Sequence, residues 1–157
     1  MVLTQGVYDL IHIGHATYLS KARLLGDVLL VGVDSDELTR ARKGPRRPIV
    51  PGEERIKMLM HLRHVDIVTV RHAHHSIGHL IETIRPDVLV VSESTTDFTR
   101  EQQEYYKKHC GTVVLMPPQA TTSSTNRMRK LAIDGAEELA AEVDRLTHSF
   151  LDRIRQA

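Results

Sequence analysis

Short apolar runs alternate along the chain with segments in which apolar residues recur at helical spacing. The clearest runs are VLLVGV at residues 28–33 and DVLVV at residues 87–91. A continuous apolar run of this length is typical of a strand that is covered on both faces of a sheet. On this pattern five strands are expected, at residues 2–6, 28–33, 66–70, 87–91 and 112–116.

Four helices are predicted between these strands, and some of their ends carry recognisable start and stop residues. The helix over 13–25 is followed by Gly26, a frequent C-terminal stop, and the next begins near Pro51 with Glu53 and Glu54 in its first turn. The expected helices cover residues 13–25, about 51–62, 76–84 and 99–109, and the basic stretch RARKGPRRP at 40–48 is expected to be a loop. Strands separated by helices predict an α/β fold with a doubly wound, five-stranded parallel sheet.

The loop after the first strand leads into the first helix and is the predicted ligand site. In a doubly wound sheet, ligands bind beyond the carboxyl ends of the strands, and unpaired N–H groups at a helix N-terminus attract phosphate. His12 and His15 stand at that N-terminus, three residues apart, so their side chains could donate to one phosphate group. Gly14 lies between them and would let a ligand approach the backbone closely.

Two other roles for His12 and His15 are open on the residues alone. Histidines commonly form structural pairs that are satisfied by nearby carbonyl groups. A metal site is disfavoured, because zinc sites need a third protein ligand and the nearest candidate, Asp9, belongs to the preceding loop.

Composition and charge narrow the class of protein. The 157 residues suit one domain with a substantial core, and 21 Lys and Arg residues are balanced by 20 Asp and Glu residues. This balance gives no basic field that would draw the protein to nucleic acid or to anionic lipid, so neither is an expected partner. Cys110 is the only cysteine, and no signal peptide or apolar run of spanning length is seen. A cytoplasmic protein is therefore expected.

The segment GVYDLIHIGH at residues 6–15 resembles the G-x-F-D-x-x-H-x-G-H signature of the cytidylyltransferase-like nucleotidyltransferases. The likeness continues in the family's order through LGDVLLVGVDSDE (25–37), KGPRRPIVPGEER (43–55), LRHVDIV (62–68) and TSSTNRMRKL (122–131). It covers the chain to about residue 131 and implies a Rossmann-like sheet with the strand order 3-2-1-4-5. Class I aminoacyl-tRNA synthetases share the HIGH sequence, but a chain of this length is not expected to hold their further domains.

The resemblance implies a nucleotidyltransferase. Such an enzyme transfers a nucleoside monophosphate from a nucleoside triphosphate to a phosphorylated small molecule, such as a sugar or polyol phosphate, and releases pyrophosphate. Because the attacking phosphate is already an anion, the protein would act mainly by positioning and by neutralising charge. Mg²⁺ is expected to come with the triphosphate, and no metal ligand is assigned to a protein side chain. Two alternatives are a coenzyme-pathway adenylyltransferase acting on a nicotinamide, pantetheine or flavin phosphate, and a regulatory module that binds nucleotide without turnover.

The resemblance also implies roles for individual residues. His12 and His15 would hold the α- and β-phosphates, Lys43 would close over a phosphate, and Ser124 and Thr125 would contact the leaving phosphates. The catalytic residues implied are His12, His15, Lys43 and Thr125. The nucleotide-binding residues implied are Gly6, Val7, Tyr8, Asp9, Gly14, Ser124, Arg127 and Arg129. The acceptor-binding residues implied are Asp9, Lys43 and Arg55.

Simpler structural roles compete with several of these assignments. Lys43 could belong to a solvated run of basic residues. Arg55 could form an ion pair with Glu53 or Asp66 on the helix surface. The hydroxyl residues at 121–125 could merely cap a helix with a basic surface.

The chain departs from the family pattern at three places. Val7 stands where many relatives have Thr, Ser or Cys, so a hydroxyl contact to phosphate is unavailable there. VVSESTTDF at 90–98 lacks the Gly-Asp pair of the glycerol-phosphate and heptose-phosphate enzymes. Gln119 stands where the glycerol-phosphate and choline-phosphate cytidylyltransferases keep an arginine. This last difference weakens the case for CTP, and ATP is slightly favoured.

Two further features lie outside the expected site. RHAHHSIGH at 71–79 gathers four histidines, for which a surface loop is preferred over a metal site. Residues 1–134 are expected to form the nucleotidyltransferase domain, and 135–157 an amphipathic helix. Its apolar stripe, predicted to pack on the same domain or, by preference, to pair two subunits as a homodimer, consists of Leu139, Val143, Leu146, Phe150 and Ile154.

Overall fold

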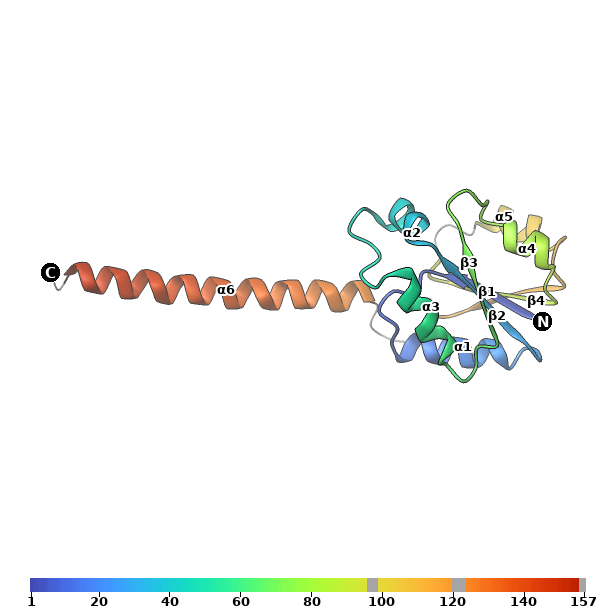
Figure 1. Ribbon diagram of the computed structural model, residues 1–157, viewed down its shortest axis with the longest axis horizontal. Coiled ribbons are helices and arrows are strands. Elements are labelled where there is room, and N and C mark those ends of the chain that lie inside the picture. Colours follow the sequence, from blue (N-terminus) through green and yellow to red (C-terminus); the bar gives the residue numbers. More distant parts are fainter. Residues whose placement is uncertain (96–98, 120–123, 156–157) are drawn as a thin grey trace. The chain divides into compact units, whose positions relative to one another are not determined.

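Five parallel strands form a single sheet in the computed structural model, which describes residues 1–95, 99–119 and 124–155 (Figure 1). The strands are β1 (Val2–Gly6), β2 (Leu29–Asp34), β3 (Ile67–Arg71), β4 (Val88–Ser92) and β5 (Thr112–Met116). Their spatial order is β3-β2-β1-β4-β5. The predicted fold class and strand order are therefore confirmed.

The central strand β1 pairs on both sides, and the strand order reverses next to it. Val2 pairs with Leu29 of β2 on one side and with Val88 of β4 on the other. Since β4 comes much later in the chain than β2, the connections on the two sides of β1 run in opposite directions. In sheets of this kind ligands bind at such a reversal, which here lies beyond Gly6 at the carboxyl end of β1.

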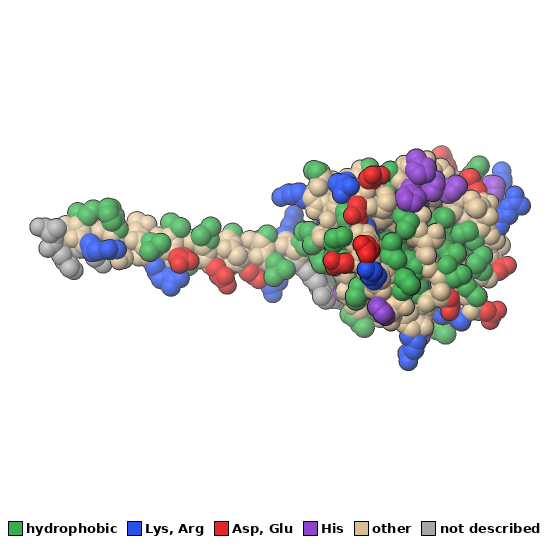
Figure 2. Space-filling model, viewed as in Figure 1, with side chains coloured by type: hydrophobic (Ala, Val, Ile, Leu, Met, Phe, Trp, Pro, Cys, Tyr) green, Lys and Arg blue, Asp and Glu red, His purple; other side chains and the backbone are tan. Residues whose placement is uncertain are grey.

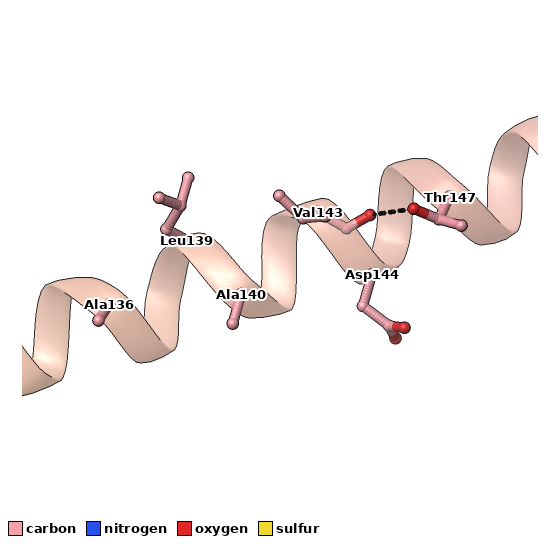
Figure 3. A pocket seen from close by; sticks show the side chains of 6 residues that line it. All are labelled: Ala136, Leu139, Ala140, Val143, Asp144 and Thr147. Atoms are coloured by element: carbon pink, nitrogen blue, oxygen red, sulfur yellow. Dashed lines mark hydrogen bonds between the residues drawn. The ribbon is translucent and has the colours of Figure 1, made fainter.

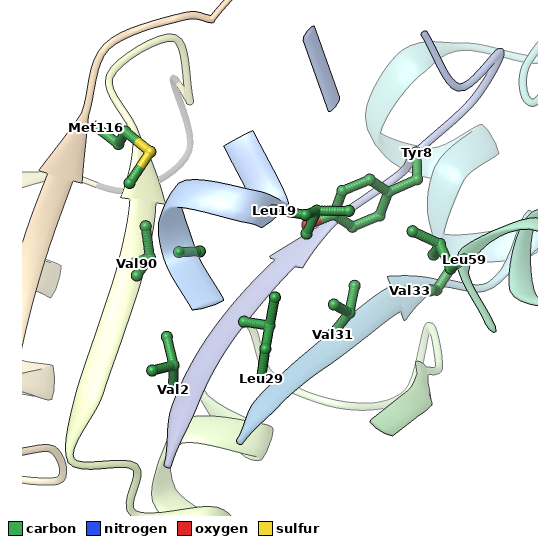
Figure 4. Close-up of a cluster of buried hydrophobic side chains, with 10 residues drawn as sticks. Val2, Tyr8, Leu19, Leu29, Val31, Val33, Leu59, Val90 and Met116 are labelled. Atoms are coloured by element: carbon green, nitrogen blue, oxygen red, sulfur yellow. The ribbon is translucent and has the colours of Figure 1, made fainter. Parts of the chain in front are cut away.

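Helices cover both faces of the sheet, so successive residues of a strand enter different cores. The helices of this α/β unit are α1 (Ile13–Arg23), α2 (Asp36–Lys43), α3 (Gly52–Met60), α4 (His79–Ile84) and α5 (Arg100–Tyr106). One core joins Val2 of β1 with Leu19 of α1 and Leu59 of α3 (Figure 4). A second core joins Leu3, the next residue of β1, with Ile81 of α4. The period-two alternation of a strand thus accounts for the two separate cores.

The prediction of a loop at residues 40–48 is wrong for residues 40–43, because α2 extends to Lys43. The Ser35 hydroxyl caps this helix by accepting a hydrogen bond from the Leu38 N–H at 3.1 Å. Gly44 follows the last turn with a φ of 98°, a backbone conformation that glycine tolerates best. Thr39 is the only buried residue of α2, so the helix has no apolar stripe that a periodicity search would detect.

The long C-terminal helix α6 (Ser124–Arg155) is a unit separate from the α/β unit and is described by itself. It has 32 residues and continues through Gly135, the position at which the extension was expected to begin. All five residues of the predicted apolar stripe are exposed. No helix within the described residues combines the length and the apolar character that a membrane span needs.

Candidate active site

The loop between β1 and α1 has a left-handed backbone at two residues that are not glycine. Tyr8 has a φ of 54° and Leu10 a φ of 50°. Such conformations cost a side-chain-bearing residue about 1 kcal/mol or more, and they persist where the surroundings enforce them. Here Tyr8 is anchored in the core between the sheet, α1 and α3, and its burial raises the pKa of its hydroxyl (Figure 4). The loop at the predicted phosphate site is therefore held in one shape.

Asp9, between these two residues, binds a segment far away in the sequence. Its buried carboxylate accepts hydrogen bonds from the backbone N–H groups of Ile49 and Val50 at 3.0–3.1 Å, and from Arg47 Nη1 at 2.5 Å. Burial alone would raise the pKa of Asp9, but these donors lower it below the usual value. Asp9 thus fixes residues 47–50 against the loop; contact with nucleotide or acceptor stays a prediction.

His12 and His15 form a reciprocal cap at the start of α1. His12 is the N-cap residue, and its Nδ1 accepts a hydrogen bond from the Gly14 N–H at 3.1 Å. In return, His15 Nδ1 accepts one from the His12 N–H at 3.4 Å. The two rings lie 4.2 Å apart between centroids and are tilted by 36°. This is the capping-box arrangement, with imidazole nitrogens in place of the usual hydroxyl and carboxylate oxygens.

The cap determines which nitrogen of each ring can donate. Because both Nδ1 atoms accept a hydrogen bond, a neutral ring must carry its proton on Nε2. Burial, reinforced by the neighbouring His12 and partly offset by Asp9, lowers the pKa of His15 to about 4. His15 is therefore a neutral Nε2–H donor at pH 7. The cap gives both rings a structural role through backbone N–H groups rather than carbonyls, and contact of their Nε2 atoms with phosphate stays a prediction.

Arg55 is fully buried and joins three segments around the loop. Its Nη1 donates to the Val7 carbonyl at 2.5 Å and its Nε to the Val50 carbonyl at 2.9 Å. Its Nη2 binds Asp36, in the first turn of α2, at 2.6 Å. The side chain therefore holds the loop after β1, the segment before α3 and the start of α2 together. Contact with an acceptor phosphate stays a prediction.

The alternative ion pairs suggested for Arg55 are wrong. Glu53 pairs with Lys57 at 2.6 Å, one turn along the exposed surface of α3. Asp66 pairs with Arg23 of α1 at 2.8 Å. Both carboxylates thus have basic partners elsewhere, whereas Arg55 points into the protein.

The basic stretch at 40–48 divides into anchored and exposed residues. Arg42 forms an ion pair with the buried Asp34, and Arg47 forms one with Asp9. Lys43 lies between them, at the last position of α2, and is exposed with no hydrogen-bond or ion-pair partner among the described residues. The two arginines connect the segment to the end of β2 and to the loop after β1, whereas Lys43 itself is solvated and its contact with a phosphate stays a prediction.

The sequence did not predict a buried ion pair at the carboxyl ends of β2 and β3. Asp34 ends β2 and Arg71 ends β3, and the two residues are partners in the register of the strands. Arg71 donates to Asp34 Oδ1 from Nε at 2.9 Å and from Nη2 at 2.6 Å. A charged residue directly after each apolar run was the available signal. Arg42 of α2 also binds Asp34, so these three side chains connect the carboxyl ends of β2 and β3 to α2.

The remaining predicted residues contribute less to the described geometry. The side chains of Ser124, Thr125 and Arg127 lie outside the described residues, and Arg129 is exposed on α6. Gln119 accepts a hydrogen bond from Lys21 Nζ at 2.5 Å and donates to the Pro117 carbonyl at 2.6 Å.

The four histidines of the 71–79 segment gather on the surface of the α/β unit, with ring centroids 4.0–5.6 Å apart (Figure 2). Within the described parts of the chain, no group of three or more His, Cys, Asp or Glu side chains could hold a metal ion.

The family model of cytidylyltransferase-like proteins matches residues 3–131, which include the whole sheet and the paired histidines. The chain belongs to the cytidylyltransferase-like family. This match supports a nucleotidyltransferase domain, as the resemblance implied.

Curated relatives of this cytidylyltransferase-like chain include two proteins named bifunctional protein HldE. The one from Syntrophotalea carbinolica is 37% identical over 131 residues, which are 83% of this chain and 26% of that protein. The one from Helicobacter acinonychis is 40% identical over 110 residues, 70% of this chain and 24% of that protein. The chain thus spans about a quarter of the length of the curated relatives it matches.

Two solved structures share the cytidylyltransferase-like fold. The lipopolysaccharide core biosynthesis protein from Thermoplasma volcanium matches with a TM-score of 0.61 and 28% identity, over 74% of this chain and 93% of that one. A protein of unknown function from Archaeoglobus fulgidus matches with a TM-score of 0.61 over 78% of this chain and 93% of that one. At 18% identity, the second structure supports the fold alone.

Proposed function

We propose that this domain transfers a nucleoside monophosphate from ATP to a sugar phosphate. An oxygen of the acceptor phosphate attacks the α-phosphorus of ATP, the bond to the bridging oxygen of the β-phosphate breaks, and pyrophosphate leaves. The observation that carries this proposal is the reciprocal cap of His12 and His15, which places two Nε2–H donors at the N-terminus of α1. Donors at a helix N-terminus suit the α- and β-phosphates of a bound nucleotide.

The neutral state of His15 in the free protein also suits this role. Charge builds up on the transferred and leaving phosphates, so a donor that is already oriented costs no reorganisation as the reaction proceeds. A bound triphosphate would favour the protonated ring and raise the low pKa of His15. Binding of the triphosphate is then coupled to protonation of His15, which places a positive charge beside the phosphates.

Lys43 supplies the mobile positive charge in this proposal. It is exposed at the end of α2, immediately before Gly44, while Arg42 and Arg47 hold the flanking backbone through Asp34 and Asp9. A lysine is suited to this task because its ammonium group is a compact charge on a flexible stem. The anchored arginines would limit the movement to the residues around Lys43.

Two observations favour the choice of ATP and of a sugar phosphate. Gln119 replaces the arginine of CTP-specific relatives, and its amide is already bound by Lys21 and Pro117. The Thermoplasma volcanium relative is named for lipopolysaccharide core biosynthesis, which is sugar chemistry. Mg²⁺ would enter with the triphosphate, held by phosphate oxygens and water as this ion prefers. An enzyme that uses these substrates would act in the cytoplasm.

A pyrophosphate-release assay tests the proposal. ATP and CTP would each be combined with sugar 1-phosphates and with polyol phosphates, with and without Mg²⁺. We expect release with ATP, a sugar 1-phosphate and Mg²⁺ together, and none when any one is omitted. A protein that binds ATP tightly but releases no pyrophosphate with any acceptor would instead be a regulatory module.

A further inference from the structure

The helix α6 carries a narrow apolar seam with the spacing of a coiled coil. Successive steps of four, three, four, three and four residues connect the seam, which consists of Ala132, Ala136, Leu139, Val143, Leu146 and Phe150. Alternation of three and four is the heptad pattern, in which these residues occupy the a and d positions. The large side chains of the seam are 54–64% exposed, so the other described residues of α6 do not cover them.

The surface beside the seam has the shape that a second helix requires. A shallow hollow on one side of α6 is lined by Ala136, Leu139, Ala140, Val143, Asp144 and Thr147 (Figure 3). Four of them, Ala136, Leu139, Ala140 and Val143, have the spacing i, i+3, i+4 and i+7 of the four residues that form a hole for one side chain in a coiled coil. The Thr147 hydroxyl donates a hydrogen bond to the Val143 carbonyl at 2.8 Å, so it does not need a water molecule in the hollow as its acceptor.

Charge changes sign along the helix close to the middle of the seam. Residues 134–144 contain no lysine or arginine, and their acidic residues are Asp134, Glu137, Glu138, Glu142 and Asp144. Residues 145–155 contain one acidic residue, Asp152, and three arginines, Arg145, Arg153 and Arg155. Two such helices side by side in the same direction would align like charges, whereas opposite directions align acidic with basic segments.

We propose that α6 pairs with α6 of a second copy in an antiparallel coiled coil centred between Asp144 and Arg145. In that arrangement a positions face d positions of the other helix. Leu139 then lies opposite Phe150, and Val143 lies opposite Leu146. Each of these two layers therefore joins two apolar side chains.

The ends of the proposed interface are complementary as well. Ala136, which is small, lies opposite Arg153, which is long and basic, and the acidic Glu137 is the neighbour of Ala136 in the chain. The two acidic segments face the two basic segments at both ends of the pair. Parallel pairing would lose both of these matches.

A second copy suits this face better than a membrane does. Helices that lie on anionic bilayers carry Lys and Arg throughout their polar face. The segment at residues 134–144 of this helix is acidic instead and contains no Lys or Arg. A membrane would repel the segment at 134–144, while a second copy would neutralise it.

The mass of the full-length chain in solution tests the pairing. We expect light scattering to give twice the chain mass of 17.8 kDa for the unmodified protein. Leu146→Glu places a charge in the seam and should give the mass of one chain. Ala141→Glu adds the same charge on the opposite, exposed side of α6 and should leave the dimer intact. A monomeric unmodified protein, or equal masses for the two variants, would overturn the proposal.

Disulfide trapping tests the direction of the pair. In a Cys110→Ser background, Leu139→Cys and Phe150→Cys chains should cross-link only when mixed. In an antiparallel pair identical positions would stand about 16 Å apart along the axis, at 1.5 Å per residue, beyond the reach of a disulfide. Cross-linking of Leu139→Cys with itself would show parallel pairing and contradict the inferred charge match. Neither experiment depends on nucleotidyl transfer, so the pairing and the proposed reaction can fail separately.

Discussion

Asp9 and Arg47 lie 38 residues apart in the sequence, yet the arginine Nη1 donates to the carboxylate at 2.5 Å. The same carboxylate binds the backbone of Ile49 and Val50. From the other side, Arg55 binds the carbonyls of Val7 and Val50. The loop after β1 and the segment before α3 are therefore connected twice, once through the acidic side chain of Asp9 and once through the basic side chain of Arg55.

Asp9→Asn should destabilise the fold, because the amide keeps the size of the carboxylate but loses its charge. We expect the free energy of unfolding to fall by about 2–3 kcal/mol, the range for hydrogen bonds from several donors to one buried charged group. Denaturant titration measures this change. Asp87→Asn is the matched control, because Asp87 pairs with the N-terminal amine on the exposed surface. Equal unfolding midpoints for both variants would show that the buried contacts do not stabilise the loop.

His12→Asn should separate the two roles of His12. Asparagine is a good N-cap and replaces the Nδ1 acceptor, but it has no group at the position of Nε2. We expect turnover to fall roughly a hundredfold, the usual effect of losing one donor to the transition state, with little change in melting temperature. His12→Ala should lose both activity and about 1 kcal/mol of stability, because it removes the cap as well. A fully active His12→Asn protein would make the residue purely structural.

His15 should make stability depend on pH in a defined window. Its pKa is about 4 in the folded protein, against 6.5 for the free side chain. Between these values the unfolded chain binds more protons than the folded one, so stability falls as the pH is lowered from 6.5 to 4.

His15→Gln tests this origin of the pH dependence. Glutamine can still accept from the His12 N–H, as it does in ordinary capping boxes, but it does not titrate. Denaturant titrations at several pH values should show a smaller loss of stability for the variant across this window. The same loss in both proteins would assign the effect to other residues.

Lys43→Ala should lower turnover without changing the unfolding midpoint, because the side chain is exposed and unpaired among the described residues. The loss should be on the order of a hundredfold, as for a single charged donor in a phosphoryl-transfer site. Arg40→Ala, on the same helix and equally exposed, is the control and should keep its activity. In the unmodified protein, ATP with Mg²⁺ should slow trypsin cleavage within residues 40–47. Cleavage at the same rate with and without nucleotide would argue against closure over a phosphate.

The sheet and the paired histidines were accessible from the sequence because local patterns encode them. The run VLTQG was expected as a strand over residues 2–6, and β1 covers Val2–Gly6. The start of α1 was expected at Ile13, where it begins, because a glycine-containing loop precedes a helical apolar pattern. Each of these features depends on residues that are close neighbours in the chain.

The polar contacts around the site were not accessible in this way. Arg71 and Asp34 are 37 residues apart, and Arg55 and Asp36 are 19 apart, so neither pair leaves a periodic signal. The helix α2 was missed for a related reason, since it is polar on nearly every side. Its signals were Ser35 as a cap and two acidic residues after it, which local capping rules could have used.

The central place of β1 has a consequence for the order in which the chain is made. β1 leaves the ribosome before the other strands of its sheet, but one of its two neighbours, β4, ends at Ser92. At about 5–20 residues per second, roughly 4–17 s pass between the synthesis of the two strands. During that interval one side of β1 has no native neighbour, so nascent chains that stop before Ser92 should be captured by chaperones or proteases, whereas longer ones can pair β1 on both sides.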